Sequence, residues 1–391
     1  MLYYTRSSLV SKKINPDPEN SWNEDWELYF SSINDPRVEG RVLHPFKDVI
    51  MLSLIAILAG AESWVEVELF GEQKFDWLSK VLTFPNGIPS HDTIGRLFSI
   101  IDSEKFQKCF IEWARSISEF PEDLISMDGK ALRGSNNFGE SPVTIVSAWS
   151  ANNKIVLGQV KTDKKSNEIT ALPKLIDTID LSGSIVSIDA AGCQKNIAKC
   201  IIDADADYLL ALKGNQGNLR DEVESFLSNI QDENVSGKNI ERYQEDVKKN
   251  HGRIEQRTCL VSNDISLLPT THAWEKLNTV VMIESLRHIH GKTTAERRYF
   301  ISSAKRSANE FLTLTRGHWG IENSLHWVLD VNFREDQCRV RAGQAAENFS
   351  ILRHLALNLI KKDTTFKGSQ RVKRKRAGWD DRYLLQLLRQ F

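Results

Sequence analysis

Three short apolar, β-branched runs follow one another soon after Pro121, and they restrict the fold of this chain more than any other feature of its sequence. They occupy residues 124–128, 143–149 and 154–160, and Gly, Asn and Ser separate them. Such runs predict three consecutive strands. Helical stretches then alternate with strand-like runs at residues 184–189 and 208–212. This order predicts a mixed α/β sheet that is covered by helices.

The segments on either side of the predicted sheet have other patterns. From Trp22 to about Phe120, apolar residues recur at steps of three and four, which predicts packed helices. Residues 84–90 interrupt that pattern, and Ser90 can cap a new helix that carries Arg96. This helix is either a DNA-reading element after a turn or plain helical packing.

The second half of the chain changes pattern twice. Between residues 215 and 300 the alternation of a β structure returns, most clearly at residues 253–262, 278–286 and 297–302, and predicts a β-rich insertion. Residues 347–361 carry apolar side chains on one helical face and predict an amphipathic helix.

Length and composition exclude several classes of protein. The 391 residues, 41% of them hydrophobic, suffice for two to three domains with full cores. Five cysteines without C-x-x-C spacing support neither a disulfide framework nor a zinc ribbon, so we expect reduced thiols in a cytoplasm. The start of the chain lacks the apolar run of a signal peptide. Residues 49–61 are shorter than the ~20 residues of a membrane span, so we expect a buried helix and no membrane association.

Two aspartates, Asp128 and Asp189, each end an apolar run and precede a small residue. Carboxylates at the ends of buried strands lie at the rim of a sheet, where α/β proteins bind ligands. Asp is also a common turn residue, so a purely structural role stays open for each. Their recurrence in two neighbouring strand-like segments, with Lys130 and Arg133 beside the first, favours a functional site.

The densest group of chemically capable residues lies between Arg316 and Asp330. His318, Glu322, His326 and Asp330 are spaced four apart, so a helix would place them in one slowly drifting stripe. Trp319 and Trp327 flank that stripe and, with nearby Ile and Leu, could instead form a core face. A core face explains a glutamate between two histidines less well, which favours a site role for Glu322.

Carboxylates from separate segments, without cysteine, favour Mg²⁺ or Mn²⁺ over zinc. Two such ions about 4 Å apart can activate a water or hydroxyl and stabilise the leaving oxygen of a phosphodiester. The sequence has no P-loop, G-x-S-x-G or Rossmann fingerprint, so nucleotide hydrolysis, serine hydrolysis and hydride transfer lose support.

A basic segment near the C-terminus favours a nucleic-acid substrate. Between residues 361 and 376 eight Lys and Arg residues face a single aspartate, Asp363. Such a segment can neutralise phosphates by counterion release, although it is also compatible with a solvated surface.

Several motifs together resemble the DDE transposases of bacterial insertion sequences, in particular the H-repeat-associated subgroup. The similarity covers nearly the whole chain: DPRVEGRVLHPF, SHDTIGRLF, SMDGKALRGS, IDAAGCQKNIA, YLLALKGNQ, HGRIEQR, RYFISS, HWGIENSLHWVLDVNFREDQCRVR and KRKRAGWDDRYLL. The resemblance implies a ribonuclease H-like core with a catalytic, metal-binding triad of Asp128, Asp189 and Glu322. It also implies that the Glu lies on a helix reached after a β-rich insertion.

One signature of related transposases is altered here. The pattern Tyr-x-x-Arg-x-x-x-Glu-x-x-x-x-x-x-Lys has Thr315, His318 and Leu329 at its Tyr, Arg and Lys positions, and only Glu322 is retained. This departure leaves the phosphate-contacting roles of Arg316, His318 and His326 open.

The fold class that follows is α/β, with a ribonuclease H-like core, a β-rich insertion and a preceding helical domain. We expect a helical, DNA-binding domain at 1–120, a core at 121–214 and 301–362, the insertion at 215–300 and a basic tail at 363–391. The residues expected to contact DNA are Lys130, Arg133, Lys213, Arg316, His318, His326, Lys373, Arg374, Lys375 and Arg376.

Three functions are compatible with these features. The first is a transposase that cleaves DNA at the terminal repeats of an insertion sequence and joins the ends to target DNA, using Mg²⁺ or Mn²⁺ and acting as a homodimer on DNA. The second is a ribonuclease H-like metal nuclease without strand transfer. The third is an inactive, DNA-binding relic, which the intact acidic triad disfavours.

Overall fold

A computed structural model describes residues 26–136, 141–163, 167–232, 239–250 and 253–391. The first 25 residues, on which the expectation about a signal peptide rests, lie outside the described residues. The strands are β1 (Leu124–Leu132), β2 (Val143–Ser150), β3 (Ile155–Lys161), β4 (Ile185–Ile188), β5 (Asp207–Leu212), β6 (Ile240–Gln244), β7 (Lys248–Asn250), β8 (Arg253–Ser262), β9 (Thr279–Ile289) and β10 (Lys292–Ser302).

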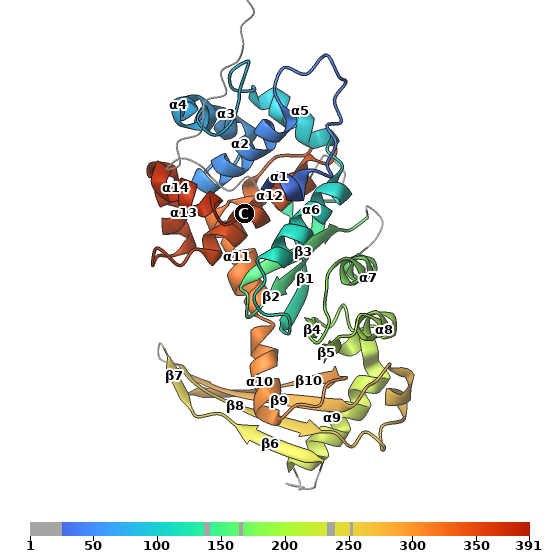
Figure 1. The fold of residues 1–391 in the computed structure, drawn as a ribbon. Coiled ribbons are helices and arrows are strands. Elements are labelled where there is room, and N and C mark those ends of the chain that lie inside the picture. The colour runs from blue at the N-terminus through green and yellow to red at the C-terminus, as the bar shows by residue number, and fades with distance from the viewer. Residues whose placement is uncertain (1–25, 137–140, 164–166, 233–238, 251–252) are drawn as a thin grey trace, which may run out of the picture.

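The helices surround this sheet at the top, along its sides and at the lower end (Figure 1). They are α1 (Trp26–Phe30), α2 (Phe46–Ala59), α3 (Trp64–Gln73), α4 (Phe75–Leu78), α5 (His91–Ile100), α6 (Ser103–Ser116), α7 (Glu168–Thr178), α8 (Lys195–Asp203), α9 (Gly217–Asp232), α10 (Ala308–Gly317), α11 (Trp327–Asn332), α12 (Ala345–Lys362), α13 (Gln370–Trp379) and α14 (Asp381–Leu388). Short 3₁₀ turns occupy Arg133–Ser135 (η1), Gly214–Gln216 (η2), Pro269–Ala273 (η3) and Glu335–Gln337 (η5), and Glu322–His326 (η4) forms a π-helical turn.

The strands form one sheet in the order β3-β2-β1-β4-β5-β10-β9-β8-β6, with β7 paired to β8. β1, β4 and β5 run parallel, whereas β2 and β3 are antiparallel additions to one edge. Each strand predicted after Pro121 is present within a few residues, which confirms the mixed α/β sheet. β1 is longer than predicted, so Asp128 lies within a strand and not at its end.

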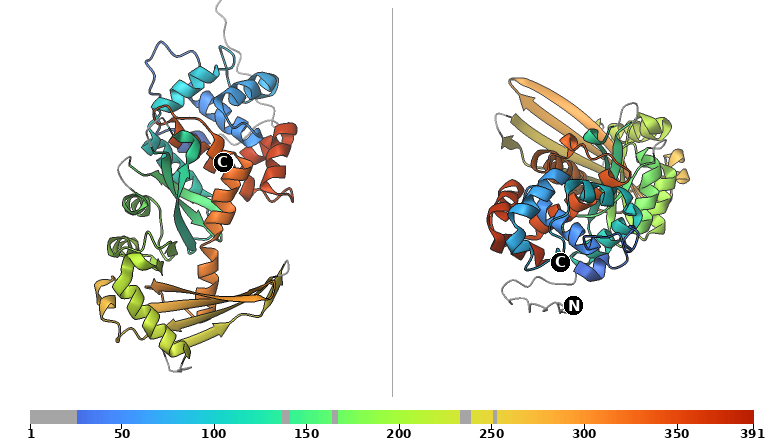
Figure 2. Two further views of the ribbon diagram at one scale, coloured as in Figure 1. Left: turned by 180° about the vertical axis from the view of Figure 1, so that it is seen from behind. Right: turned by 90° about the horizontal axis from the view of Figure 1, so that it is seen from above.

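The region between β5 and α10 differs in part from the predicted β-rich insertion. It begins with a helix, α9, whose apolar residues pack under β8, β9 and β10. β10 pairs directly with β5, so the sheet runs without interruption from the core strands into this region. Figure 2 shows α10 rising from the lower strands toward the upper helices, which links the two ends of the molecule.

α12 is buried on every side, which corrects the prediction of an amphipathic helix. It packs against α2, α5, α6 and β3, and its polar residues are buried along with its apolar ones. Asn358 shows how this is tolerated: its side chain donates to the Val156 carbonyl at 2.9 Å and accepts from the Val156 N–H at 2.8 Å. Those backbone groups lie on the outer side of edge strand β3, so Asn358 completes the sheet where no strand follows.

The predicted buried helix at residues 49–61 corresponds to α2, whose residues from Asp48 to Leu58 are all buried. In the described part of the chain no single helix is long and apolar enough to cross a membrane, and α2 and α3 meet such a test only as a pair bent by 92°. The N-terminal helices share one apolar core with α12, α13 and α14.

Replacement of Asn358 by Ala should lower the free energy of unfolding by about 2–4 kcal/mol, because it leaves the N–H and C=O of Val156 buried and unpaired. Chemical denaturation of the variant measures this loss. Asn309→Ala, at an exposed position of α10, is the matched control and should change stability by less than about 0.5 kcal/mol. Equal losses in the two variants would contradict the assigned role of Asn358.

Candidate active site

The register of two parallel strands brings Asp128 and Asp189 together. The last paired positions of β1 and β4 are Met127 and Ile188, and each strand carries an aspartate at the next residue. Adjacent strands lie about 4.8 Å apart, so the two carboxylates emerge side by side. Asp189 Oδ1 also accepts from the Ala191 N–H at 2.9 Å, so the predicted turn role holds for this residue as well.

Glu322 comes to the same place from the helix that follows the insertion. Asp128, Asp189 and Glu322 all line a cavity of about 820 Å³ between the core and the strands β8, β9 and β10. They are 61 and 133 residues apart in sequence, and tertiary structure alone joins them.

Three of the four residues in the predicted stripe contact the core strands: His318 contacts β4, and His326 and Asp330 contact β1. His318 Nδ1 is 2.9 Å from Ser187 Oγ, and His326 Nδ1 is 3.6 Å from Asp128 Oδ2. Asp330 Oδ1 is 2.7 Å from Lys130 Nζ. Trp319 and Trp327 are 45% and 58% exposed, so they do not form the alternative core face.

Lys130 joins β1 to the chain beyond Glu322. Its ammonium group lies within 3.3 Å of carboxylate oxygens of Asp330, Glu335 and Asp336, and its side chain is 11% exposed. A lysine that is surrounded by three acids holds the helix against the strand. It is not available to phosphates, which corrects the expectation that Lys130 contacts DNA.

Glu168, the first residue of α7, is a fourth acid at the site, and the sequence analysis missed it. The Glu168 side chain lies directly against Gly129: a Cβ atom at Gly129 would be 2.1 Å from Glu168 Oε1, so a larger residue there would displace this carboxylate. Burial and the charge of Asp189 raise the pKa of Glu168. An acid in a first helical turn is common, so its sequence position alone gives no functional signal.

Burial strongly affects the protonation of the site. It raises the pKa of Asp128 to about 7, and the charges of Glu168, Asp189 and Glu322 act in the same direction, against a hydrogen bond from the Gly129 N–H. Burial and the charge of Lys130 lower the pKa of His326 to about 4, so its ring is neutral at physiological pH. The cluster is therefore short of positive charge.

The donor set fits a divalent metal ion. Asp128, Glu322 and His326 each offer a ligand atom, and these atoms all lie within 4.8 Å of one another. Carboxylate oxygens are the preferred ligands of Mg²⁺ and also suit Mn²⁺. An ion would supply the positive charge that the raised pKa of Asp128 indicates is missing.

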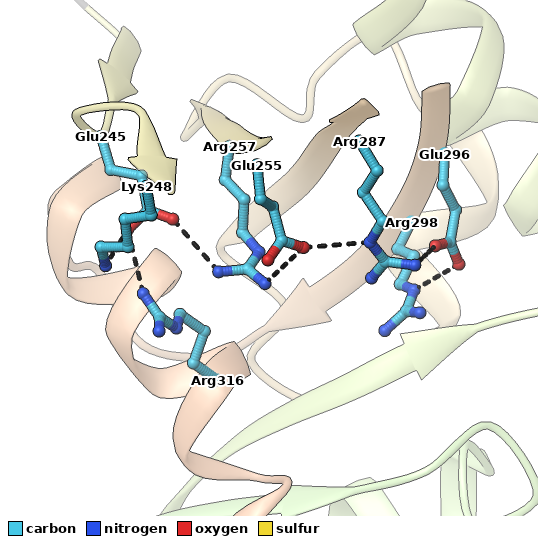
Figure 3. Close-up of polar contacts among 8 residues, drawn as sticks. All are labelled: Glu245, Lys248, Glu255, Arg257, Arg287, Glu296, Arg298 and Arg316. Atoms are coloured by element: carbon cyan, nitrogen blue, oxygen red, sulfur yellow. Dashed lines mark hydrogen bonds and ion pairs between the residues drawn. The ribbon is translucent and has the colours of Figure 1, made fainter. Parts of the chain in front are cut away.

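Five residues that line the cavity, Arg257, Arg287, Glu296, Arg298 and Arg316, belong to a ladder of ion pairs (Figure 3). The ladder starts at α10 and at residues 245–248 and continues across β8, β9 and β10. Each of its glutamates bridges neighbouring cations, with distances of 2.7 to 3.5 Å. The ladder consists of Lys248, Arg257, Arg287, Arg298 and Arg316 with Glu245, Glu255 and Glu296.

Two glutamates of the ladder, Glu245 and Glu296, have a pKa below the usual range. Although burial raises the pKa of Glu245, contacts from Lys248, Arg316 and Arg257 hold it below its usual range. Arg298 also lies over the Trp319 ring, 5.5 Å from its centroid. The ladder carries five cations against three anions, and four of the cations, Arg257, Arg287, Arg298 and Arg316, line the same cavity as the acids.

The other residues expected to contact DNA have different surroundings. Arg133 and Lys213 are exposed, and Lys213 lines the cavity. Lys375 is exposed on α13, whereas Arg376 lies over the rings of Phe366 and Tyr383.

The surroundings of Lys373 and Arg374 correct the prediction that they belong to a basic, DNA-binding tail. Both are buried in α13, a packed helix. Lys373 Nζ donates to the Ile360 carbonyl at 3.2 Å, and Arg374 donates to the carbonyls of Ile57 and Ala61 at 2.9 and 2.8 Å. They complete the ends of α12 and α2 and cannot meet a phosphate there. His326 is also buried, at 7% exposure.

The helix predicted after Ser90 is α5, and Ser90 caps it through the Thr93 N–H. Leu97 and Phe98 are buried, while Arg96 is exposed. Arg96 lines a second cavity, of about 680 Å³, together with Arg334, Arg339 and Arg341.

Comparisons with known proteins give a consistent result. A family model described as "Transposase DDE domain" matches residues 98–359, and one described as "DDE_Tnp_1-associated" matches residues 28–114. The chain is 42% identical over 372 residues to "Putative transposase YncI" of Escherichia coli O157:H7, covering 92% of this chain and 93% of that protein.

Two further proteins are similar to the chain. "H repeat-associated putative transposase YhhI" of Escherichia coli K12 is 40% identical over 368 residues, covering 92% of this chain and 96% of that protein. A solved structure described as a piggyBac transposase synaptic complex with hairpin DNA aligns with 93% of this chain and 80% of that chain, at 10% identity and a TM-score of 0.45.

Replacement of Asp128 by Asn should stabilise the protein at high pH in EDTA. The folded chain holds a proton on Asp128 up to about pH 7, whereas an unfolded aspartate releases it near pH 4. Wild-type stability therefore falls as the pH rises through this window. At pH 8 the variant should exceed the wild type by roughly 2–4 kcal/mol, and at pH 4 the two should be equal.

Unfolding by urea at both pH values measures this effect. Asp221→Asn, at an exposed position of α9, is the control and should show no pH-dependent gain. A gain for Asp128→Asn that is the same at pH 4 and pH 8 would contradict the assigned pKa.

Proposed function

The chain belongs to the family of transposases with a DDE domain, in the group of H repeat-associated proteins. From this premise we propose that it cleaves DNA strands at the ends of an insertion sequence and transfers the freed 3′-OH ends to target DNA. Asp128, Asp189 and Glu322 are the catalytic residues. The observation that carries this proposal is that the three acids line one cavity together with several arginines.

The topology supports a ribonuclease H-like core for this reaction. Three parallel strands, β1, β4 and β5, are flanked by antiparallel β2 and β3, and helices cover both faces. The first acid comes from β1, the second follows β4, and the glutamate lies on a helix after an inserted region. We propose the domains accordingly: 1–120, 121–214 with 301–362, and 215–300, with residues 363–391 as a C-terminal segment that packs on the N-terminal helices.

The acids and the basic residues of the cavity have different roles in the proposed reaction. Mg²⁺ or Mn²⁺ bound at the acids would activate a water or 3′-OH and stabilise the leaving oxygen of the phosphodiester. Lys130 fixes the Glu322 helix against β1, so the acids keep their relative positions. The ladder arginines and Lys213 bind the DNA backbone, and this holds the strand in the cavity.

Recognition of the terminal repeats is proposed for the N-terminal region. Arg96 on α5 lines the second cavity together with Arg334, Arg339 and Arg341, and the lining also contains the acids Glu62, Glu66 and Asp92. A capped helix with an exposed arginine is able to enter a major groove. The enzyme would act as a homodimer on paired DNA ends, in the cytoplasm.

A metal nuclease without strand transfer is the second candidate. It uses the same acids and the same DNA-binding residues, so only the joining step separates it from a transposase. An inactive relic is disfavoured by the three intact acids.

Cleavage of a supercoiled plasmid that carries candidate element ends, with Mg²⁺ and a labelled target, tests the proposal. The wild type should nick the ends and join them to the target. Glu322→Gln should abolish both reactions and still bind end DNA, because a neutral amide is a poor ligand for a hard cation.

Glu112→Gln, on the exposed face of α6, is the matched control and should leave both reactions unchanged. Nicking without joining would favour the nuclease. Undiminished cleavage by Glu322→Gln would contradict the proposed triad.

The ladder makes a second prediction, on salt dependence. Arg257, Arg287 and Arg298 replaced together by Gln should flatten the salt dependence of DNA binding, by a slope on the order of 0.9 for each phosphate that the variant no longer neutralises. The companion variant Glu255→Gln/Glu296→Gln should strengthen binding, because it removes the competing anions. Fluorescence anisotropy between about 50 and 200 mM salt measures both effects.

The control removes three charges from the distant helix α6, as Lys105→Gln/Lys108→Gln/Arg115→Gln, and should leave the slope unchanged. Equal slopes for the ladder variant and the wild type would rule out the ladder as a phosphate-binding surface.

A further inference from the structure

His326 occupies an unusual position behind the acids. Only 7% of the residue is exposed, and its Nε2 atom has no hydrogen-bond partner among the described residues. Its Nδ1 atom faces Asp128 Oδ2 at 3.6 Å, which is too long for a hydrogen bond. A buried imidazole without a good partner is costly, so its retention in the interior requires a reason.

The positions of the neighbouring acids supply such a reason. Ligand atoms of His326, Asp128 and Glu322 lie within 4.8 Å of one another. Two ligands on opposite sides of an ion, at about 2.1 Å each, are about 4.2 Å apart. The three side chains therefore need only small movements to share one ion.

The local backbone favours the same arrangement. The π-helical turn η4 begins at Glu322 and ends at His326, and the Trp327 N–H closes it on the Glu322 carbonyl. π-Helical turns are rare, and single turns of this kind inside α-helices are frequently found at functional sites. This turn presents the glutamate and the imidazole together toward Asp128.

We propose that His326 is a direct ligand of the metal ion in this site, so that the ion is held by an imidazole nitrogen as well as by carboxylates. The inference rests on the proposed metal-dependent function. His326 would supply a nitrogen ligand, whereas the three acids offer only oxygen ligands. Imidazole suits transition-metal ions better than Mg²⁺, so His326 would bias the site toward Mn²⁺.

A purely positioning role predicts something different. In that case His326 would donate a hydrogen bond to Asp128 and orient its carboxylate, and no nitrogen would bind the ion. Both roles predict weaker metal binding when His326 is replaced, by on the order of 10-fold or more. Affinity alone therefore does not separate the two roles, and the test must detect the metal–nitrogen bond.

Pulsed electron paramagnetic resonance of Mn²⁺ on the full-length chain makes that distinction. With Mn²⁺ below the protein concentration, the wild type should show modulation from a directly bound ¹⁴N nucleus. Labelling the wild type with ¹⁵N-histidine should replace that modulation by the ¹⁵N pattern, and this requires no substitution. His326→Gln should lose the ¹⁴N signal.

Two histidine variants serve as controls. His44→Gln removes a histidine of similar burial, 9% exposed, that also has an unpaired Nδ1 but lies among the N-terminal helices. His318→Gln removes the histidine that lines the cavity, whose Nδ1 already contacts Ser187. Both should keep the ¹⁴N signal.

The outcomes separate this inference from the proposed function. If Mn²⁺ binds and Glu322→Gln weakens that binding, but no histidine nitrogen is detected, the ligand role is overturned and the metal-dependent function stands. A signal that survives in His326→Gln has the same meaning. If neither Asp128→Asn nor Glu322→Gln affects Mn²⁺ binding, both the inference and the proposed metal site fail.

Discussion

The ion cluster around Lys130 is the interaction on which the acidic site depends. Lys130 is two residues after Asp128 on β1, so strand alternation puts both side chains on one face of the sheet. Its three carboxylate partners all follow Glu322 in sequence. A lysine buried among acids is stable only with those partners, and the acids need the lysine equally. This mutual dependence fixes the glutamate-bearing helix relative to the strand that carries the first aspartate.

The cavity combines two opposite electrostatic environments. At the acids, burial and crowding raise the pKa of Asp128, because four carboxylates approach each other without a cation of their own. In the ladder, arginines exceed the glutamates that pair with them. A phosphodiester accompanied by divalent cations complements both groups, since the phosphates satisfy the arginines and the cations satisfy the acids. The glutamates of the ladder keep the arginines ordered when no polyanion is bound.

The N-terminal helices and the C-terminal helices pack together, although they are far apart in the sequence. Helices from both ends of the chain share one apolar core around α12. Arg374 illustrates the consequence: it binds carbonyls at the end of α2 and lies 4.3 Å from the centroid of the Phe333 ring. A cation of the predicted DNA-binding tail thus joins α2 to the segment that follows the Glu322 helix. The prediction that Arg374 contacts DNA came from the number of basic residues near the C-terminus. A sequence does not show which basic side chains have buried carbonyls to bind.

The sequence by itself determined the existence of the core strands, the four-residue stripe from His318 to Asp330, the cap of α5 and the family of the protein, because these depend on local periodicity and on motifs. It also indicated Asp128, Asp189 and Glu322 as the residues of interest. Only the tertiary structure decided which side chains meet. Glu168 and His326 join the acids, Lys130 becomes a structural tie, and Lys373 and Arg374 enter the interior. The physical reason is that burial and the pairing of charges arise between segments far apart in the chain, where sequence spacing carries no information.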